Sequence, residues 1–159
     1  MQGITREKMR KRSGFTLIEM LIVIAVISIL AGVVLTGVTG FQASARDTRR
    51  VADLKNTQNF LELYFNKCGI YPSDEDCGNA DPSSWSDLVE VMEAAGISSQ
   101  FPKPAVDSYP YYYEPGSDNF SYIIGAKLER DNRILDESAD GSVGGQSCGR
   151  DSQIYCIQS

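Results

Sequence analysis

The chain has 159 residues, of which 23% are charged, and its formal net charge is −6. This length accommodates one globular domain together with one extended element. The acidic balance argues against a broad nucleic-acid-binding surface, because such a surface needs clustered lysine and arginine. The absence of histidine removes the commonest general base and transition-metal ligand. The sequence also has no nucleophile–base pair, phosphate-binding glycine loop or metal-ligand box, so we predict that the chain is not an enzyme.

Residues 1–14 form a basic segment at the amino terminus. They include five basic and one acidic side chain, a net charge of +4, so the remaining residues carry −10. The basic side chains stand directly before a long apolar run: Arg6, Lys8, Arg10, Lys11 and Arg12. By the positive-inside rule they place the start of that run at the cytoplasmic face, which accounts for them better than nucleic-acid binding. We therefore predict a leader at 1–14.

Residues 15–40 are predicted to form a membrane-spanning helix. From Phe15 to Leu35 almost every side chain is apolar, and the single ionisable one is Glu19. A run of about 20 apolar residues is long enough to cross a bilayer core as a helix. A carboxylate inside such a run is costly unless something compensates it, which makes Glu19 a candidate functional residue. A secretory signal would have a shorter apolar core ending in a small-residue cut site, and a plain anchor would have no use for Glu19.

The segment 13–19, with the sequence SGFTLIE, resembles the signal of type IV prepilins, a family that includes type IV pilins and the major pseudopilins of type II secretion. The resemblance implies that a prepilin peptidase cuts after Gly14 and N-methylates Phe15. It also implies that Glu19 pairs with the new terminal amine, either of its own subunit or of a neighbour. A pair between subunits would set the axial register of stacked helices.

The resemblance further implies an α+β fold, with a long amino-terminal helix whose first half spans the membrane and whose second half packs on a small antiparallel sheet. The expected product is a helical homopolymer. Its expected partners are the peptidase, an inner-membrane assembly platform and the membrane itself, with no nucleic acid. The chain is expected in the inner membrane before assembly and in an extracellular or periplasmic filament afterwards.

Three functions within this family stay open. Two disulfides would favour a type IV pilus exposed outside the cell. The string Gly69-Ile70-Tyr71-Pro72 and the Asp140-Gly141 loop are similar to major pseudopilins of type II secretion and favour a pseudopilus. A minor pilin acting as a tip or binding module, in adhesion or DNA uptake, is the third.

Residues 41–68 are predicted to continue the same helix with one buried face. Apolar and neutral side chains recur there at a spacing of three or four: Val51, Leu54, Gln58, Leu61 and Phe65. Gly69 is a suitable helix stop. Arg46, Asp47, Arg49 and Arg50 are expected to form a polar collar near the outer membrane edge. Three glycines, at positions 32, 37 and 40, permit either local unwinding or close helix packing.

Residues 69–159 are predicted to form the globular head. After a loop at 69–83, Ser84 and Asp87 mark a helix start, and the apolar face of that helix consists of Trp85, Leu88, Val89 and Met92. The tyrosines at 109–113 are expected to alternate between sheet core and surface, with an exposed adhesive patch as the alternative. Pro110 keeps their strand short or at an edge.

A second strand is predicted from Phe120 to about Glu129, with alternate residues from Phe120 to Leu128 on the buried face. Residues 130–152 are expected to be a long loop, and Gln153–Ile157 the last strand. The sheet then has about three strands.

Four cysteines lie beyond the predicted span, on the exported side: Cys68, Cys77, Cys148 and Cys156. An oxidising compartment favours disulfides there. Four cysteines allow three pairings, among which sequence proximity favours Cys68–Cys77 and Cys148–Cys156. Zinc is the alternative, but neither pair has the close spacing that zinc sites use.

Acidic residues gather among glycines in the last loop, at Asp136, Asp140 and Asp151. Residues 139–145 are similar to the calcium loop of the major pseudopilins. Carboxylates and backbone carbonyls on a flexible loop suit Ca²⁺, so a structural calcium ion is one hypothesis. A solvated acidic loop is the alternative, and no other cofactor is expected.

Overall fold

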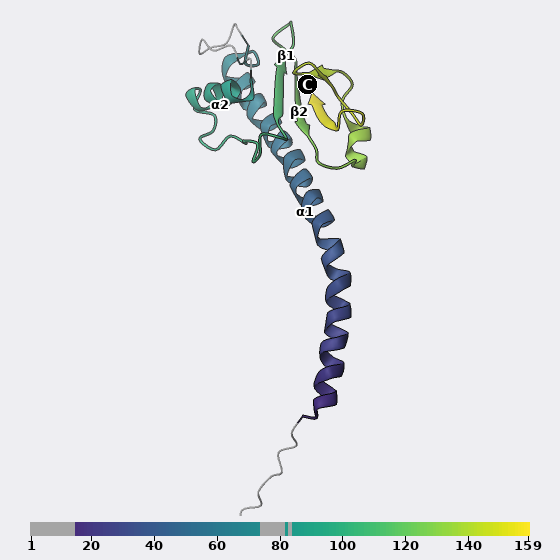
Figure 1. Cartoon of the computed structure of the whole chain (residues 1–159). Helices are drawn as coiled ribbons and strands as arrows, with labels where there is room; N and C mark the ends of the chain where they lie inside the picture. Colours follow the sequence, from purple (N-terminus) through teal and green to yellow (C-terminus); the bar gives the residue numbers. More distant parts are fainter. Residues whose placement is uncertain (1–14, 74–81, 83) are drawn as a thin grey trace, which may run out of the picture. The chain divides into compact units, whose positions relative to one another are not determined.

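The computed structural model describes residues 15–73, 82 and 84–159, apart from the side chains of 33–39 (Figure 1). The chain divides into two compact units, Met1–Thr39 and Gly40–Ser159. The elements follow in the order α1 (Leu17–Cys68), α2 (Trp85–Ala94), β1 (Tyr111–Pro115), β2 (Tyr122–Lys127), the 3₁₀ helix η1 (Arg133–Glu137), β3 (Ser142–Val143), β4 (Gln146–Ser147) and β5 (Ile154–Gln158).

In the first unit, the described part of α1 exposes its apolar side chains. Twelve large hydrophobic residues between Phe15 and Leu30 are each at least 47% exposed, up to 91% for Leu17. Among the described residues, no helical stretch combines the length and the apolarity needed to cross a membrane.

In the second unit, α1 buries one face, as the three-four spacing predicted. Of the residues in that spacing, Val51, Leu54 and Leu61 are at most 8% exposed, and Gln58 and Phe65 are half-buried. Tyr64 is buried beside them. The predicted stop is confirmed: α1 ends at Cys68, and Gly69 has φ +78°, the left-handed conformation that glycine adopts without a steric penalty.

Helix α2 begins where the sequence predicted. Ser84 is its N-cap, and the Ser84 hydroxyl accepts the backbone N–H of Asp87 at 3.3 Å. All four predicted core residues of α2 are buried, together with Val91. The Trp85 ring Nε1–H donates to the Pro102 carbonyl at 2.9 Å and so fixes the connector that follows.

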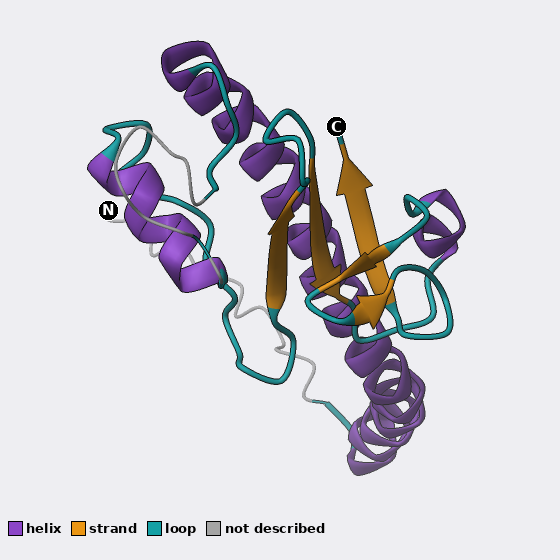
Figure 2. Ribbon diagram, turned by 90° about the horizontal axis from the view of Figure 1, so that it is seen from above, coloured by secondary structure: helices purple, strands orange, loops and turns teal. Residues whose placement is uncertain are grey.

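The sheet has three antiparallel strands in the order β1-β2-β5, so β1 lies at an edge as Pro110 predicted. Tyr111 and Tyr113 of β1 are buried and Tyr112 is half-buried, which confirms the expected alternation. One face of the sheet packs on α1, and Figure 2 shows the helix running behind the strands. The second strand is shorter than predicted, because Phe120 belongs to the preceding turn and is 61% exposed.

The other face of the sheet is also covered, which the sequence did not predict. Residues 130–152, expected to be a loop, include η1 and a hairpin of β3 and β4. Val143, Ile154 and Cys156 form a second, smaller core with Tyr112 and Ile123 around it. The hairpin therefore closes the sheet on the side away from α1 (Figure 2).

Candidate functional site

At the amino-terminal end of α1, Glu19 is held by Thr16. The Glu19 carboxylate accepts the backbone N–H and the hydroxyl of Thr16, each at 2.8 Å. In return the Thr16 hydroxyl accepts the backbone N–H of Glu19 at 3.3 Å. This reciprocal pair is a capping box, which satisfies backbone donors that the start of a helix leaves unpaired. Sequence reasoning considered only an amine partner for Glu19 and missed this local one, which the Thr-x-x-Glu spacing signals.

Two predicted processing residues lie on either side of the boundary of the described chain. Gly14 lies outside the described residues. Phe15 is 79% exposed. The peptide bond between them is the one that the prepilin resemblance implies is cut.

In the second unit, the back face of α1 is exposed and uncharged. Its residues recur every three or four positions, and we call them the uncharged stripe: Phe41, Ala45, Thr48, Ala52, Asn56, Asn59, Leu63 and Asn66. All eight are exposed, Phe41 at 79% and Leu63 at 52%. A solvent-facing helix surface ordinarily carries charge, so this face has the composition of a contact surface.

Some of the residues expected to form a polar collar are instead buried in the head. Asp47 has no exposed surface, and Arg50 is 6% exposed. The Asp47 carboxylate accepts the backbone N–H groups of Glu129 (2.8 Å) and Arg130 (3.1 Å) and the Arg50 guanidinium (2.8 Å). A buried carboxylate of this kind must be paired, and Asp47 thereby joins α1 to the segment after β2.

Glu129 completes this network. Its two carboxylate oxygens accept from Arg46 and Arg50 at 2.6–2.8 Å, and the Arg50 guanidinium lies 4.4 Å from the centre of the Tyr109 ring. Hydrogen bonds from Arg46, followed by those from Arg50, lower the pKa of Glu129 to about 2. The sequence carried a signal that Asp47 and Arg50 are buried. Both residues continue, toward the amino terminus, the helical spacing of the buried residues Val51 and Leu54.

Buried tyrosines also tie the head to α1. The Tyr111 hydroxyl donates to Asp53 at 2.8 Å, and the Tyr71 hydroxyl donates to Glu62 at the same distance. Burial, followed by the hydrogen bond to Glu62, raises the pKa of Tyr71 to about 12. Both hydroxyls therefore stay protonated donors at physiological pH.

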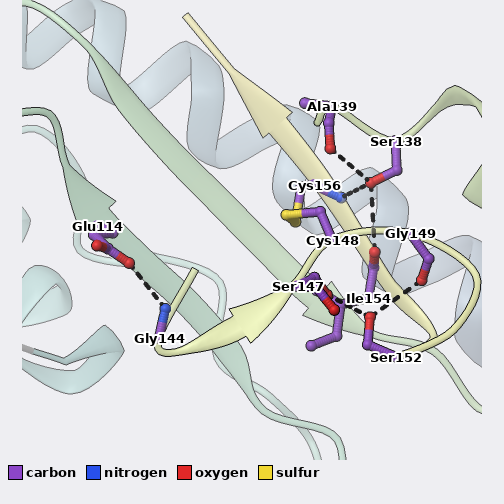
Figure 3. Close-up of a disulfide and its surroundings, with 10 residues drawn as sticks. All are labelled: Glu114, Ser138, Ala139, Gly144, Ser147, Cys148, Gly149, Ser152, Ile154 and Cys156. Atoms are coloured by element: carbon purple, nitrogen blue, oxygen red, sulfur yellow. Dashed lines mark hydrogen bonds between the residues drawn. A yellow bond between two sulfur atoms is a disulfide. The ribbon is translucent and has the colours of Figure 1, made fainter. Parts of the chain in front are cut away.

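The last part of the chain is closed by a disulfide between Cys148 and Cys156, the pairing that proximity favoured (Figure 3). The Ser138 hydroxyl accepts the backbone N–H of Cys156 at 2.9 Å, so the outer edge of β5 is occupied at this point. Cys68 is also disulfide-bonded. Its predicted partner Cys77 lies outside the described residues.

The three acidic residues considered for calcium are not gathered into a metal site. Both carboxylate oxygens of Asp136 accept from the Arg150 guanidinium at 2.8 Å, and Arg150 also pairs with Asp131. No group of three or more acidic or cysteine side chains in the described part of the chain is placed to hold a metal ion. Asp136 is thus paired with a guanidinium, and the calcium hypothesis stays a prediction.

Comparison with known proteins shows what the chain is similar to. Residues 9–35 match the prokaryotic N-terminal methylation motif. The chain is 27% identical to type II secretion system core protein G of Vibrio cholerae, over 96% of this chain and 97% of that protein. It is therefore similar to pilins and pseudopilins, most clearly around the methylation motif. The long helix followed by a small antiparallel sheet is the expected pilin-like α+β fold.

Two pilins match the chain over shorter stretches. The type IV wide pilus major component PilA4 of Thermus thermophilus is 46% identical over 35% of this chain and 43% of its own length. The type IV major pilin protein PilE1 of Neisseria gonorrhoeae is 34% identical over 46% of this chain and 34% of its own length. No solved structure matches the pilin-like chain significantly.

Proposed function

We propose that the chain is a structural subunit of a type IV pilus-like filament. A prepilin peptidase removes residues 1–14 and methylates Phe15, and residues 15–40 hold the subunit in the inner membrane until an assembly platform extracts it. The mature chain then joins a helical homopolymer that is extracellular or periplasmic. The role is mechanical and involves no catalytic residue.

The observation that carries this proposal is the long exposed surface of α1. Apolar side chains from Phe15 to Leu30 and the uncharged stripe from Phe41 to Asn66 are left exposed in a single described chain. Exposed apolar surface on this scale marks a site of membrane or protein contact. Burial against the same helix of other copies covers both surfaces at once, and heterologous contacts of this type generate open filaments.

Glu19 supplies the register of the proposed filament. In the described chain one of its oxygens accepts both Thr16 donors, which leaves the other oxygen available to a terminal amine created after Gly14. An ion pair between the amine and the carboxylate removes two unpaired charges from apolar surroundings, and separating such a pair is strongly destabilising.

The test compares Glu19→Ala with Ser28→Ala in sheared filament preparations. We expect Glu19→Ala to be processed after Gly14 but to yield few or no filaments. Ser28 is a matched polar position, because its hydroxyl already bonds the Ile24 carbonyl of its own helix at 2.7 Å, so Ser28→Ala should assemble. Normal filament yield from Glu19→Ala, or a mature chain that retains Met1 by mass spectrometry, would refute the proposal.

The major pseudopilin of a type II secretion system is the second candidate. The match to core protein G extends over almost the whole of both chains, whereas the pilin matches cover less than half of each pilin. A strain lacking this chain distinguishes the two functions. Loss of protein secretion with intact surface pili supports the pseudopilus, and the reverse result supports the pilus. A trace amount of the chain in filaments would instead indicate a minor subunit.

A further inference from the structure

A groove of about 570 Å³ lies between α2 and the start of β1, and the proposed filament function does not use it. Its apolar lining comes from Trp85 and Val89 on α2, from Pro104 and Pro110 on the connector, and from Tyr111 on β1. Trp85 and Tyr111 are in edge-to-face contact, with ring centroids 5.0 Å apart. Figure 2 shows the connector running between α2 and the edge strand, and residues of all three segments line the groove.

The rim of the groove is acidic. Glu90, Glu93 and Asp107 line it, and Lys103 is the single cation among the lining residues. Lys103 is paired with Glu93 at 3.7 Å, which leaves Glu90 and Asp107, both exposed, without an ion-pair partner among the described residues. Because the charges cluster at the mouth of an apolar hollow, the field there favours a cationic ligand with apolar side chains.

The adjoining strand edge offers main-chain hydrogen bonds. Lys127 N–H donates to the Pro110 carbonyl and Gly116 N–H donates to the Ser121 carbonyl. The backbone groups of Tyr111, Tyr113 and Pro115 between them therefore point away from β2. No backbone partner is found for their outward groups among the described residues. The opposite edge differs, because β5 is closed at Ile154 by Gly149 and at Cys156 by Ser138 and Ala139.

We propose that this groove binds an extended basic peptide segment of another protein. Basic side chains would meet Glu90 and Asp107, an alternate aliphatic side chain would enter the hollow beside Trp85, and the peptide backbone would bond the outer edge of β1 at Tyr111. Strand addition of this kind obtains affinity from main-chain bonds and specificity from pockets for alternate side chains.

The basic side chains that would pair with Glu90 and Asp107 have to come from another protein. Five of the ten basic side chains after Gly40 are already bound within the head: Arg46, Arg50, Lys67, Arg130 and Arg150. Apart from Lys103 in the groove, the remaining ones lie in helices or a strand, at Arg49, Lys55, Lys127 and Arg133. The described part of the chain thus has no extended basic segment to offer a second copy, and the basic leader is absent from the mature chain under the proposed function.

The experiment titrates the mature full chain, dispersed in detergent micelles, with a blocked pentapeptide of alternating lysine and valine. Trp85 is the single tryptophan of the chain, so its fluorescence reports on the groove. We expect a saturable change with the basic peptide, none with a glutamate–valine peptide, and slowed hydrogen exchange at the Tyr111 amide. Glu90→Lys with Asp107→Lys should weaken binding at least tenfold.

The matched control is Glu137→Lys with Asp140→Lys, which makes the same change in net charge at exposed residues outside the groove. It should weaken binding less than twofold. Equal weakening by both double variants, equal binding of the acidic peptide, or no saturable Trp85 signal would overturn the proposal. So would a Trp85 signal that changes with chain concentration in the absence of peptide, since a second copy would then fill the groove. The measurement does not depend on filament assembly, and its failure would leave the proposed function untouched.

Discussion

At the scale of single residues, Asp47 helps to hold the described head on α1. Its carboxylate accepts two backbone N–H groups from one segment and a guanidinium from its own helix, without exposed surface. Without it the two backbone N–H groups would lose this acceptor and Arg50 would keep only Glu129, and polar groups that lose their partners are costly where water is excluded. The Asp47 carboxylate is thus part of the packing, not a solvated collar.

Replacing Asp47 with asparagine tests this role. Asp47→Asn breaks a buried ion pair, and we expect it to lower the free energy of unfolding by about 3 kcal/mol. Asp136→Asn is the matched control, because its pair with Arg150 is exposed and should contribute less than about 1 kcal/mol. Urea unfolding monitored by circular dichroism measures both. A loss of stability no larger at Asp47 than at Asp136 would contradict the assignment.

Glu129 makes the stability of the head depend on pH. Its pKa is held at about 2, below the ordinary value of 4.5, so the folded state favours the ionised form. A depressed carboxyl pKa gives a stabilisation that is complete above the unfolded pKa and disappears as the pH falls through the folded pKa. Allowing for solvent screening, we expect about 1–2 kcal/mol to be lost between pH 5 and pH 2.

The comparison of wild type with Glu129→Gln isolates this effect from the other carboxyl groups. Glu129→Gln should melt at a lower temperature than wild type at pH 6, and the two melting curves should converge as the pH approaches 2. A difference in melting temperature that stays constant across that range would show that Glu129 does not act through its charge.

At the scale of elements, β2 is the central strand and is packed on both faces. Tyr122, Ile124 and Ala126 point toward α1, while Gly125 faces the β3–β4 hairpin. A side chain at Gly125 would place its Cβ 2.7 Å from a methyl carbon of Val143 and 3.1 Å from one of Ile154. The hairpin therefore approaches the sheet closely only because residue 125 has no side chain.

Gly125→Ala should destabilise the head by about 1–3 kcal/mol, the range found for overpacked cores. Val143→Ala, which removes the carbon that the new Cβ would meet, should itself cost about 1–2 kcal/mol through a cavity. The double variant should lose less than the sum of the two, because the changes compensate in volume. Strict additivity in thermal unfolding would show that the two residues do not meet.

At the scale of the whole molecule, the residues that stabilise the head differ from the apolar residues exposed before Gly40. The unit Gly40–Ser159 contains both hydrophobic cores, the ion network around Asp47 and the Cys148–Cys156 bond. The unit before it presents apolar side chains that remain exposed in the described single chain. Under the proposed function, assembly needs these exposed residues together with the uncharged stripe, whereas folding of the head does not depend on the exposed residues of the first unit.

A chain that begins at Gly40 should therefore fold and unfold cooperatively but not polymerise. Size-exclusion chromatography should show a monomer, and circular dichroism should retain the helix signal of residues 40–68. Full-length chain purified in detergent, which should form filaments when the detergent is removed, serves as the control. Filaments formed by the truncated chain would show that the first unit is not required for assembly.

The sequence alone was sufficient for features whose determinants are local. The Ser84 cap, the apolar face of α2, the Gly69 stop and the alternation of the β1 tyrosines depend on neighbours within a few residues, so periodicity and capping rules predicted them. The motif around Gly14 and Glu19 is likewise a short stretch of sequence, and it carried the resemblance to type IV prepilins. The Cys148–Cys156 pairing followed from short separation along the chain.

Only the tertiary structure decided which distant residues meet. The pairing of Asp47 and Arg50 with Glu129 joins positions about eighty residues apart. The periodicity of α1 places Asp47 and Arg50 on the buried face of the helix, but it does not indicate the distant residue that pairs with them. The same holds for the hairpin over Gly125 and for the ion pair of Arg150 with Asp136, a residue also considered for calcium. Short-range preferences determine elements, whereas burial and charge pairing depend on the whole packed chain.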